Sequence, residues 1–311
     1  MAGLTHSAFR RLVSDFGGCG ALFTEMLCGR WLRHEKLDRS PAVKRRPQEG
    51  PVIYQLMLIE PEDVPPILER LAMIAPAGID LNCACPAPNV RHVGAGSELF
   101  EDRGRLAAIL TALRSGYPGL LTVKIRLGSP KPGWRERLAD RLRLFEDCGV
   151  DAVTLHPRFS DEKLRRRARH ELFPELAAST RLPLIANGDI TGPGTLAGHT
   201  EYFANVAGIM VGRMAVIQPW IFAQWEGASL ELNYLEIWTR FARYVREDFE
   251  PVHAFRRLKL FTLYYARNFL FGHTLHAIAQ AALDLESLTE RATCFLANAP
   301  AVNRSPSCYQ A

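Results

Sequence analysis

One cysteine in this chain stands at a place that suits a reactive group. Cys85 follows a short apolar segment, residues 79–83, and precedes Pro86 and a glycine-rich run at residues 94–97. In barrels of alternating strands and helices, active sites lie at the carboxyl ends of the strands. A thiol just past a strand end, with a proline and a glycine run behind it, therefore predicts a reactive cysteine beneath a mobile loop.

A set of polar side chains falls at the ends of the apolar segments. Burying such groups without partners costs about 1–3 kcal/mol each, so a functional site explains them better than a core does. The set comprises Gln55, Asn82, Lys124, Arg126, His156, Arg158 and Asn187.

Two glycine-marked turns complete this set, Asn-Gly-Asp-Ile at residues 187–190 and Val-Gly-Arg at residues 211–213. In barrels, the loops at these two places bind phosphate, so we expect a phosphorylated cofactor. No Gly-x-Gly-x-x-Gly motif follows a predicted strand, which argues against a Rossmann dinucleotide site.

The elements that must position these residues are strands alternating with helices. Strands are expected at residues 21–27, 52–57, 79–83, 121–127, 152–156, 182–186 and 208–212. Helices are expected at residues 6–17, 30–37, 61–74, 103–115, 136–148, 171–179, 193–204 and 213–226. This alternation predicts an α/β fold, a (β/α)8 TIM barrel, over residues 1–228. A closed barrel needs one strand more, and we expect it ahead of Met1, behind an upstream start codon.

After residue 228 the alternation stops and helical patterns follow. Residues 229–300 are predicted to form a small helical domain, and residues 301–311 a disordered tail. The expected helices are at residues 232–249, 251–271, 273–282 and 286–297.

Composition narrows the functional classes. The chain is 48% apolar and 23% charged, typical of a globular protein, and it has no apolar run long enough for a membrane span. Its start has no signal peptide, and its 7 cysteines form no spaced framework, which indicates reduced thiols in the cytoplasm. No second cysteine pair accompanies Cys83 and Cys85, so we expect no metal and place Cys83 in the core.

Basic residues gather in three segments, 30–46, 156–170 and 251–280. The middle segment carries Arg165, Arg166 and Arg167 in a loop at the carboxyl end of a predicted strand. Basic loops beside a barrel mouth neutralise phosphates, so this distribution favours a nucleic acid as partner.

The ordered set of motifs resembles the tRNA-dihydrouridine synthases over residues 1 to about 225. The motifs are MAGLT…AFRRLV, TEM, YQLM, DLNCACP…GAGSELF, VKIR, TLHPR, NGDI and GIMVGRMA…QPWIF. The resemblance implies an FMN-dependent TIM barrel that reduces the C5–C6 bond of specific uridines in the tRNA D-loop with NADPH. It also implies that the C-terminal helices bind tRNA.

The resemblance implies a role for each matching residue. Cys85 matches the family's general acid, which protonates C5 of the uracil ring. The cofactor-binding positions are Met1, Gln55, Lys124, His156, Asn187, Gly188, Asp189, Gly212 and Arg213. The substrate-binding positions are Asn82, Arg126, Arg158, Arg165, Arg166 and Arg167.

Some positions depart from the family's pattern. Only Met1-Ala2-Gly3 remains of its Ala-Pro-Met-Ala-Gly start, Pro157 replaces the glycine of its His-Gly-Arg stretch, and Pro88 and Asn89 stand where many members carry lysines. Two alternatives stay open, a flavin barrel acting on a small pyrimidine-like molecule and a decayed, non-catalytic RNA-binding protein. No protein partner is predicted, and the chain is expected to be a monomer.

Overall fold

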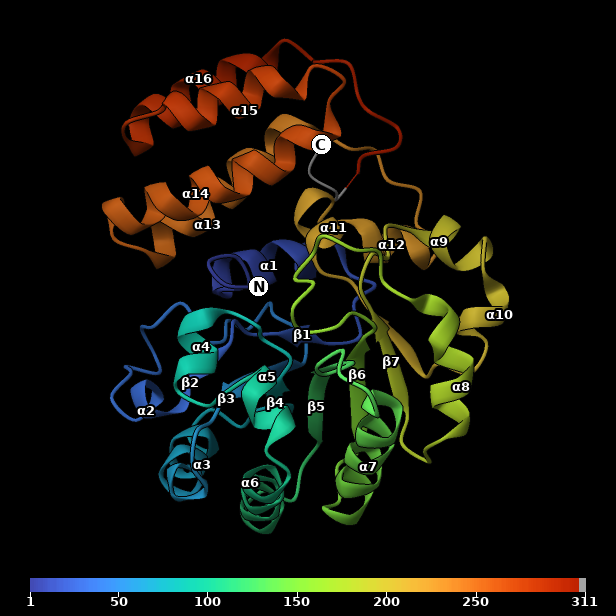
Figure 1. Cartoon of the computed structure of the whole chain (residues 1–311). Coiled ribbons are helices and arrows are strands. Elements are labelled where there is room, and N and C mark those ends of the chain that lie inside the picture. The colour runs from blue at the N-terminus through green and yellow to red at the C-terminus, as the bar shows by residue number, and fades with distance from the viewer. Residues whose placement is uncertain (308–311) are drawn as a thin grey trace.

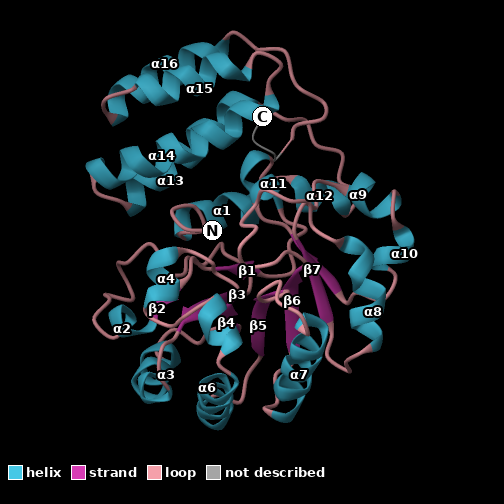
Figure 2. Ribbon diagram, viewed as in Figure 1, coloured by secondary structure: helices cyan, strands magenta, loops and turns pink. Residues whose placement is uncertain are grey.

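The computed structural model describes residues 1–307 and consists of a curled parallel sheet with a layer of C-terminal helices above it (Figures 1 and 2). The strands are β1 (Leu22–Phe23), β2 (Leu27–Cys28), β3 (Val52–Met57), β4 (Gly78–Cys83), β5 (Leu121–Arg126), β6 (Ala152–His156), β7 (Leu184–Asn187) and β8 (Gly208–Met210). They lie in the order β1-β3-β4-β5-β6-β7-β8, all parallel, and β2 also pairs with β3.

Helices alternate with these strands and cover the outer face of the sheet (Figure 1). The helices of this part are α1 (Ser7–Phe16), α2 (Gly29–Leu32), α3 (Val64–Ala72), α4 (Pro88–His92), α5 (Ser97–Glu101), α6 (Arg103–Gly116), α7 (Trp134–Asp147), α8 (Phe173–Ala178), α9 (Pro193–Ala197), α10 (Thr200–Phe203), α11 (Arg213–Ile217) and α12 (Ile221–Trp225). The predicted barrel architecture is confirmed. Within residues 1–307 the strand pairing does not close the ring between β8 and β1.

The C-terminal layer contains α13 (Tyr234–Asp248), α14 (Pro251–Tyr265), α15 (Gly272–Ala281) and α16 (Leu285–Ala297). All four lie where the sequence predicts helices, although α14 ends earlier and passes into a 3-10 turn at Ala266–Asn268. Residues 301–303 are held to the turn before α15, because the amide of Leu270 donates to Ala301 O and the amide of Asn303 to Asn268 O. Residues 308–311 of the predicted tail, with Cys308, lie outside the described residues.

The first predicted strand, residues 21–27, is wrong in one respect, because it is two short strands. Leu22 pairs with Val52 and Leu27 with Leu56, and the segment between them leaves the ladder. There the hydroxyl of Thr24 accepts from the amide of Gln55 at 3.0 Å, so a side chain replaces a backbone partner. Residues 30–37 form only the single turn α2, and the helices predicted at 193–204 and 213–226 each divide into two.

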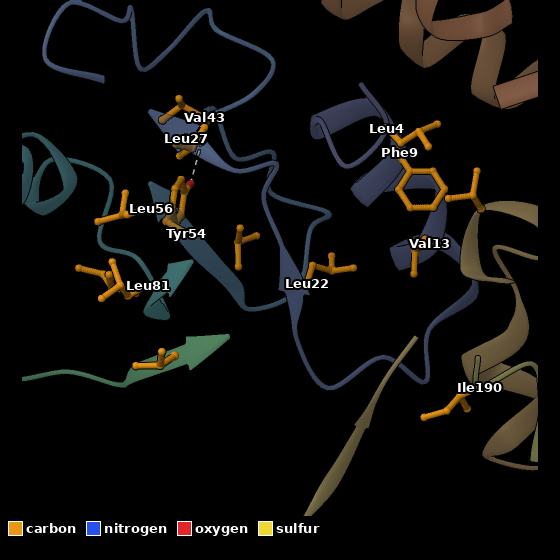
Figure 3. Packing of buried hydrophobic residues seen from close by; sticks show 14 of the residues in the cluster. Leu4, Phe9, Val13, Leu22, Leu27, Val43, Tyr54, Leu56, Leu81 and Ile190 are labelled. Carbon is orange, nitrogen blue, oxygen red and sulfur yellow. Dashed lines mark hydrogen bonds between the residues drawn. The ribbon is translucent and has the colours of Figure 1, made fainter. Parts of the chain in front are cut away.

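The core runs without a break from the sheet into the C-terminal helices. Figure 3 shows its β3 side, where Tyr54 and Leu56 pack near Leu27 and Leu81. Tyr54 is fully buried, and its hydroxyl donates to the carbonyl of Val43 at 2.8 Å, so its one polar atom is satisfied inside the core. No helix within residues 1–307 is both long and apolar enough to cross a membrane.

The glycine-rich run after Cys85, for which the sequence predicts a mobile loop, is packed against the cysteine in this structure. It lies between α4 and α5, Ala95 is fully buried, and the amide of Ser97 donates to Cys85 O at 3.0 Å. Gly96 has φ 59°, and a Cβ on it would lie 2.6 Å from Cys85 O. The run therefore packs directly against the backbone of the cysteine.

Ion pairs fasten the C-terminal layer to the barrel. Arg11 of α1 pairs with Glu247 at 2.7 Å, and the carboxylate of Asp248 receives Lys44 at 2.6 Å and Arg46 at 2.5 Å. The side chain of Asp248 is fully buried and that of Lys44 is 11% exposed, so each of these two charges needs the other as its counterion.

We expect Asp248→Ala to lower the free energy of unfolding by about 3 kcal/mol, because it leaves Lys44 buried without a counterion. Glu286→Ala is the control, since its pair with Arg246 is 76% and 41% exposed and is expected to contribute less than about 1 kcal/mol. Denaturant unfolding of both variants measures the difference, and equal losses would contradict the prediction.

Gly96→Ala is expected to lower the free energy of unfolding by about 1–3 kcal/mol, because a side chain at this backbone conformation is strained and meets Cys85 O. Gly50→Ala is the matched control, since a Cβ on Gly50 meets no atom of residues 1–307 within 4 Å. If the two variants unfold at the same denaturant concentration, the packing against Cys85 carries no energy.

Candidate active site

The strand register places the polar residues in tiers. Gln55 is level with Asp80, which is level with Thr122. Two residues further along, Asn82 is level with Lys124. Residues two apart on a strand share one face, so these tiers lie one above the other. The bond from Lys124 to Asn187 passes from β5 to β7 across β6, which is only feasible on the inner face of the curled sheet.

Cys85 is held at the top of this inner face through its backbone. The side-chain oxygen of Asn82 accepts from the amide of Cys85 at 3.0 Å and from that of Ala84 at 3.1 Å. Cys85 itself is partly exposed. Cys83 is 1% exposed, and burial raises the pKa of its thiol well above the usual value. The prediction that Cys83 belongs to the core is confirmed.

Lys124 provides a partly buried cation below Cys85. Its ammonium donates to the side-chain oxygen of Asn187 at 3.0 Å, and the amide nitrogen of Asn187 donates to Met210 O at 2.9 Å. Burial lowers the pKa of Lys124 to about 8, and the nearby carboxylate of Asp80 opposes that effect. The ammonium is therefore mostly protonated at neutral pH.

Arg158 is fully buried and joins several loops at the mouth of the sheet. It pairs with Asp189, and its guanidinium lies 2.7 Å from Nε2 of His156. Arg213 also binds Asp189, at 3.0 Å. Burial and the surrounding cations, Lys124 first among them, hold the pKa of His156 well below its usual value. His156 is thus a neutral imidazole whose Nε2 accepts from Arg158.

The basic loop after β6, which carries Arg165, Arg166 and Arg167, is held in place through its backbone. Arg126 donates to Lys163 O at 2.8 Å, Arg158 donates to Arg166 O at 2.5 Å, and Ala168 donates its amide to Asp189 at 2.8 Å. The side chains of residues 165–167 are exposed. The site therefore orders the loop from within and leaves its arginine side chains in solvent.

Most of the residues that the sequence predicts for the site fall into two neighbouring groups in the structure. The structure brings together Gln55, Asn82, Cys85, Lys124 and Asn187 on the inner face. At the end of β6 and in the adjoining loops it brings together His156, Arg158, Gly188, Asp189 and Arg213. Met1 lies at Gly212, where a Cβ would be 3.8 Å from its sulfur.

Arg126 and Arg158 differ in position from Arg165, Arg166 and Arg167. They are 7% and 0% exposed, and their donors go to the basic loop and to Asp189. Their place indicates that they support the site, whereas the exposed arginines lie where a large partner can reach them.

One residue of this site was missed from the sequence. Asp80 is fully buried and accepts from Thr122 Oγ1 at 2.6 Å and from Gln55 Nε2 at 2.7 Å. The signal was present, because an acidic residue inside an otherwise apolar strand must have partners in the fold.

Known proteins resemble this chain in sequence. The model of the dihydrouridine synthase family matches residues 1–266. A tRNA-dihydrouridine synthase B of Escherichia coli K12 is 29% identical over 302 residues, which cover 93% of this chain and 92% of that protein. A probable tRNA-dihydrouridine synthase of Helicobacter pylori J99 is 32% identical, over 75% of this chain and 70% of that one. The match to tRNA-dihydrouridine synthase B of Xanthomonas campestris, 30% identical, covers 72% of this chain and 66% of the relative, just under two thirds.

Solved structures resemble it in fold. Histamine dehydrogenase from Rhizobium sp. 4-9 superposes with a TM-score of 0.53 at 12% identity, over 76% of this chain and 46% of that one. The old yellow enzyme homologue of Zymomonas mobilis gives 0.52 at 10% identity, over 76% and 87% of the two chains. Because the family model spans most of the sequence, the chain belongs to the dihydrouridine synthase family.

Proposed function

We propose that this protein reduces the C5–C6 bond of uridines in the D-loop of tRNA, with FMN as cofactor and NADPH as electron donor. Its family and its relatives, which are named as tRNA-dihydrouridine synthases, support this reaction. The observation that carries the proposal is the place of Cys85, a partly exposed thiol whose backbone is fixed by Asn82 above the partly buried ammonium of Lys124.

The residues present fit an anionic flavin phosphate. Four cations lie close enough to His156 to lower its pKa, although burial lowers it more. They are Lys124, Arg126, Arg158 and Arg213. The buried carboxylates among them are Asp80 and Asp189. Positive charge therefore exceeds negative charge at the mouth. The hydroxyl of Thr154, level with Lys124 in the register, is buried and has no hydrogen-bond partner among residues 1–307.

Each group then has a task in the reaction. FMN, when bound, supplies a hydride to C6 of the uracil ring. Cys85 gives its thiol proton to C5, so the base gains one hydride and one proton, and solvent returns a proton to the thiolate. Lys124 and Asn187 hold the flavin side of the site, with positive charge available for the reduced cofactor.

The exposed arginines of the basic loop favour RNA over a small pyrimidine as substrate. A small molecule needs no cationic loop beside the mouth, whereas RNA phosphates gain from exposed arginines there. A target base extruded from the tRNA reaches Cys85, and the loop and the C-terminal helices hold its flanks. We place this reaction in the cytoplasm and treat the protein as a monomer.

Cys85→Ala is expected to lower the rate of dihydrouridine formation at least about a hundredfold, because it removes the general acid. FMN content and tRNA affinity stay unchanged, since the backbone amide of residue 85 still binds Asn82. Single-turnover assays on tRNA measure the rate, and absorbance measures FMN. Cys294→Ala, which removes an exposed thiol, is the control. Equal rates for the two variants would contradict the assignment, and a protein that takes up no FMN would contradict the proposed function.

Reversing Arg165, Arg166 and Arg167 to Glu together is expected to weaken tRNA binding at least about tenfold and to reduce its salt dependence. FMN content is expected to hold, because the loop is fastened by backbone atoms rather than by these side chains. Arg143→Glu, on the exposed side of α7, is the control. Loss of FMN in the triple variant would instead show that the loop is structural.

A further inference from the structure

A chain of side-chain hydrogen bonds leads from the centre of β4 to Cys85. The carboxylate of Asp80 accepts from Gln55 Nε2 at 2.7 Å, and Gln55 Oε1 accepts from Asn82 Nδ2 at 2.9 Å. Asn82 Oδ1 then accepts from the amide of Cys85 at 3.0 Å. Asp80 lies at the far end and does not reach the thiol itself.

The two ends of this chain fix its direction. A carboxylate can only accept a hydrogen bond, and a backbone N–H can only donate one. The two amides between them have nearly the same shape either way round, so hydrogen bonding alone decides how they point. With an acceptor at Asp80 and a donor at Cys85, both Gln55 and Asn82 must turn their nitrogens toward Asp80.

We propose that Asp80 is a positioning residue that sets the direction of the Gln55–Asn82 amide pair and thereby fixes the backbone of Cys85. Reversal of either amide would bring an NH2 group against the amide of Cys85 or an oxygen against the carboxylate. The consequence for catalysis rests on the proposed function, whereas the direction of the amides does not.

The burial of Asp80 alters the ionisation of its carboxyl group. The residue is fully buried, and burial raises its pKa to about 6 against the opposing effects of its hydrogen bonds and of Lys124. A carboxyl group whose pKa is raised on folding stabilises the fold below its unfolded pKa and loses that contribution as the pH rises through about 6. At neutral pH the ionised group therefore stabilises the fold less than its protonated form does at low pH.

Reversing the chain tests its direction. Asn82→Asp puts an acceptor-only group at each end of Gln55, so one carboxylate must face the amide oxygen whichever way Gln55 turns. In the double variant Asp80→Asn/Asn82→Asp, residue 80 can donate its NH2 to Gln55 Oε1, and Gln55 Nε2 can donate to residue 82. The oxygen of residue 82 still accepts from Cys85, and the total charge equals that of the natural chain.

The full chain, as purified and without tRNA, is measured at pH 8 by thermal unfolding and by the alkylation rate of Cys85, read by mass spectrometry. Asn82→Asp is expected to lower the unfolding midpoint by at least about 4 °C and to raise the alkylation rate several-fold as residue 85 loosens. Adding Asp80→Asn is expected to reverse at least about half of the change in unfolding midpoint and half of the change in alkylation rate. The reason is that the effects of substitutions at two interacting residues are not additive. The amount of FMN retained per chain is expected to fall in the Asn82→Asp variant and to recover in the double variant.

Thr122→Val in the Asn82→Asp background is the matched control. It also removes a hydrogen bond from Asp80, but it cannot reverse the chain, so it is expected to rescue nothing. Additive losses in the Asp80→Asn/Asn82→Asp variant would overturn the proposal, and so would an insoluble double variant. If Asn82→Asp alone is insoluble and the double variant folds, the proposal is supported. No readout needs turnover, so a failure here is distinct from a failure of the proposed function.

Discussion

A fully buried guanidinium, that of Arg158, determines how the mouth of this sheet is built. An arginine without water must place its N–H groups on protein acceptors or lose several kcal/mol. The guanidinium of Arg158 donates hydrogen bonds to Asp189, to His156 and to the carbonyl of Arg166. These partners come from the loop after β7, the end of β6 and the basic loop. One buried charge thus links the loop after β7, which is proposed to bind the flavin phosphate, to the basic loop, which is proposed to contact RNA.

This link explains why a strongly basic loop can remain ordered beside a cationic site. Repulsion among Arg165, Arg166 and Arg167 tends to extend the loop, but its backbone carbonyls are held by Arg126 and Arg158. Their side chains remain in solvent, where salt screens them and a polyanion can pair with them. The site therefore contains two kinds of arginine, buried donors that hold the backbone and exposed cations that are proposed to contact RNA.

Much of the sheet could be predicted because its central strands are short, continuous apolar runs. The expected bounds of β3 and β6 agree with the structure, since each strand is buried on both faces and needs no alternation. The split of the first strand depends on Thr24, whose side chain bonds an amide far along the sequence. Local pattern cannot show such a contact. The same holds for Arg158, whose burial depends on Asp189, 31 residues away.

The roles of the glycine-rich run and of Asp80 depend on contacts that a local sequence pattern does not show. Glycine-rich runs are typical of mobile loops, yet Gly96 is needed here because Cys85 O leaves no room for a side chain. The partners of Asp80, Gln55 and Thr122, lie on other strands. Both residues act on Cys85 through its backbone, one on its carbonyl side and one, through two amides, on its N–H side. The proposed transfer of a proton from the thiol to one carbon atom requires a fixed position for Cys85, and these backbone contacts provide it without any side chain bonded to the sulfur among the residues described.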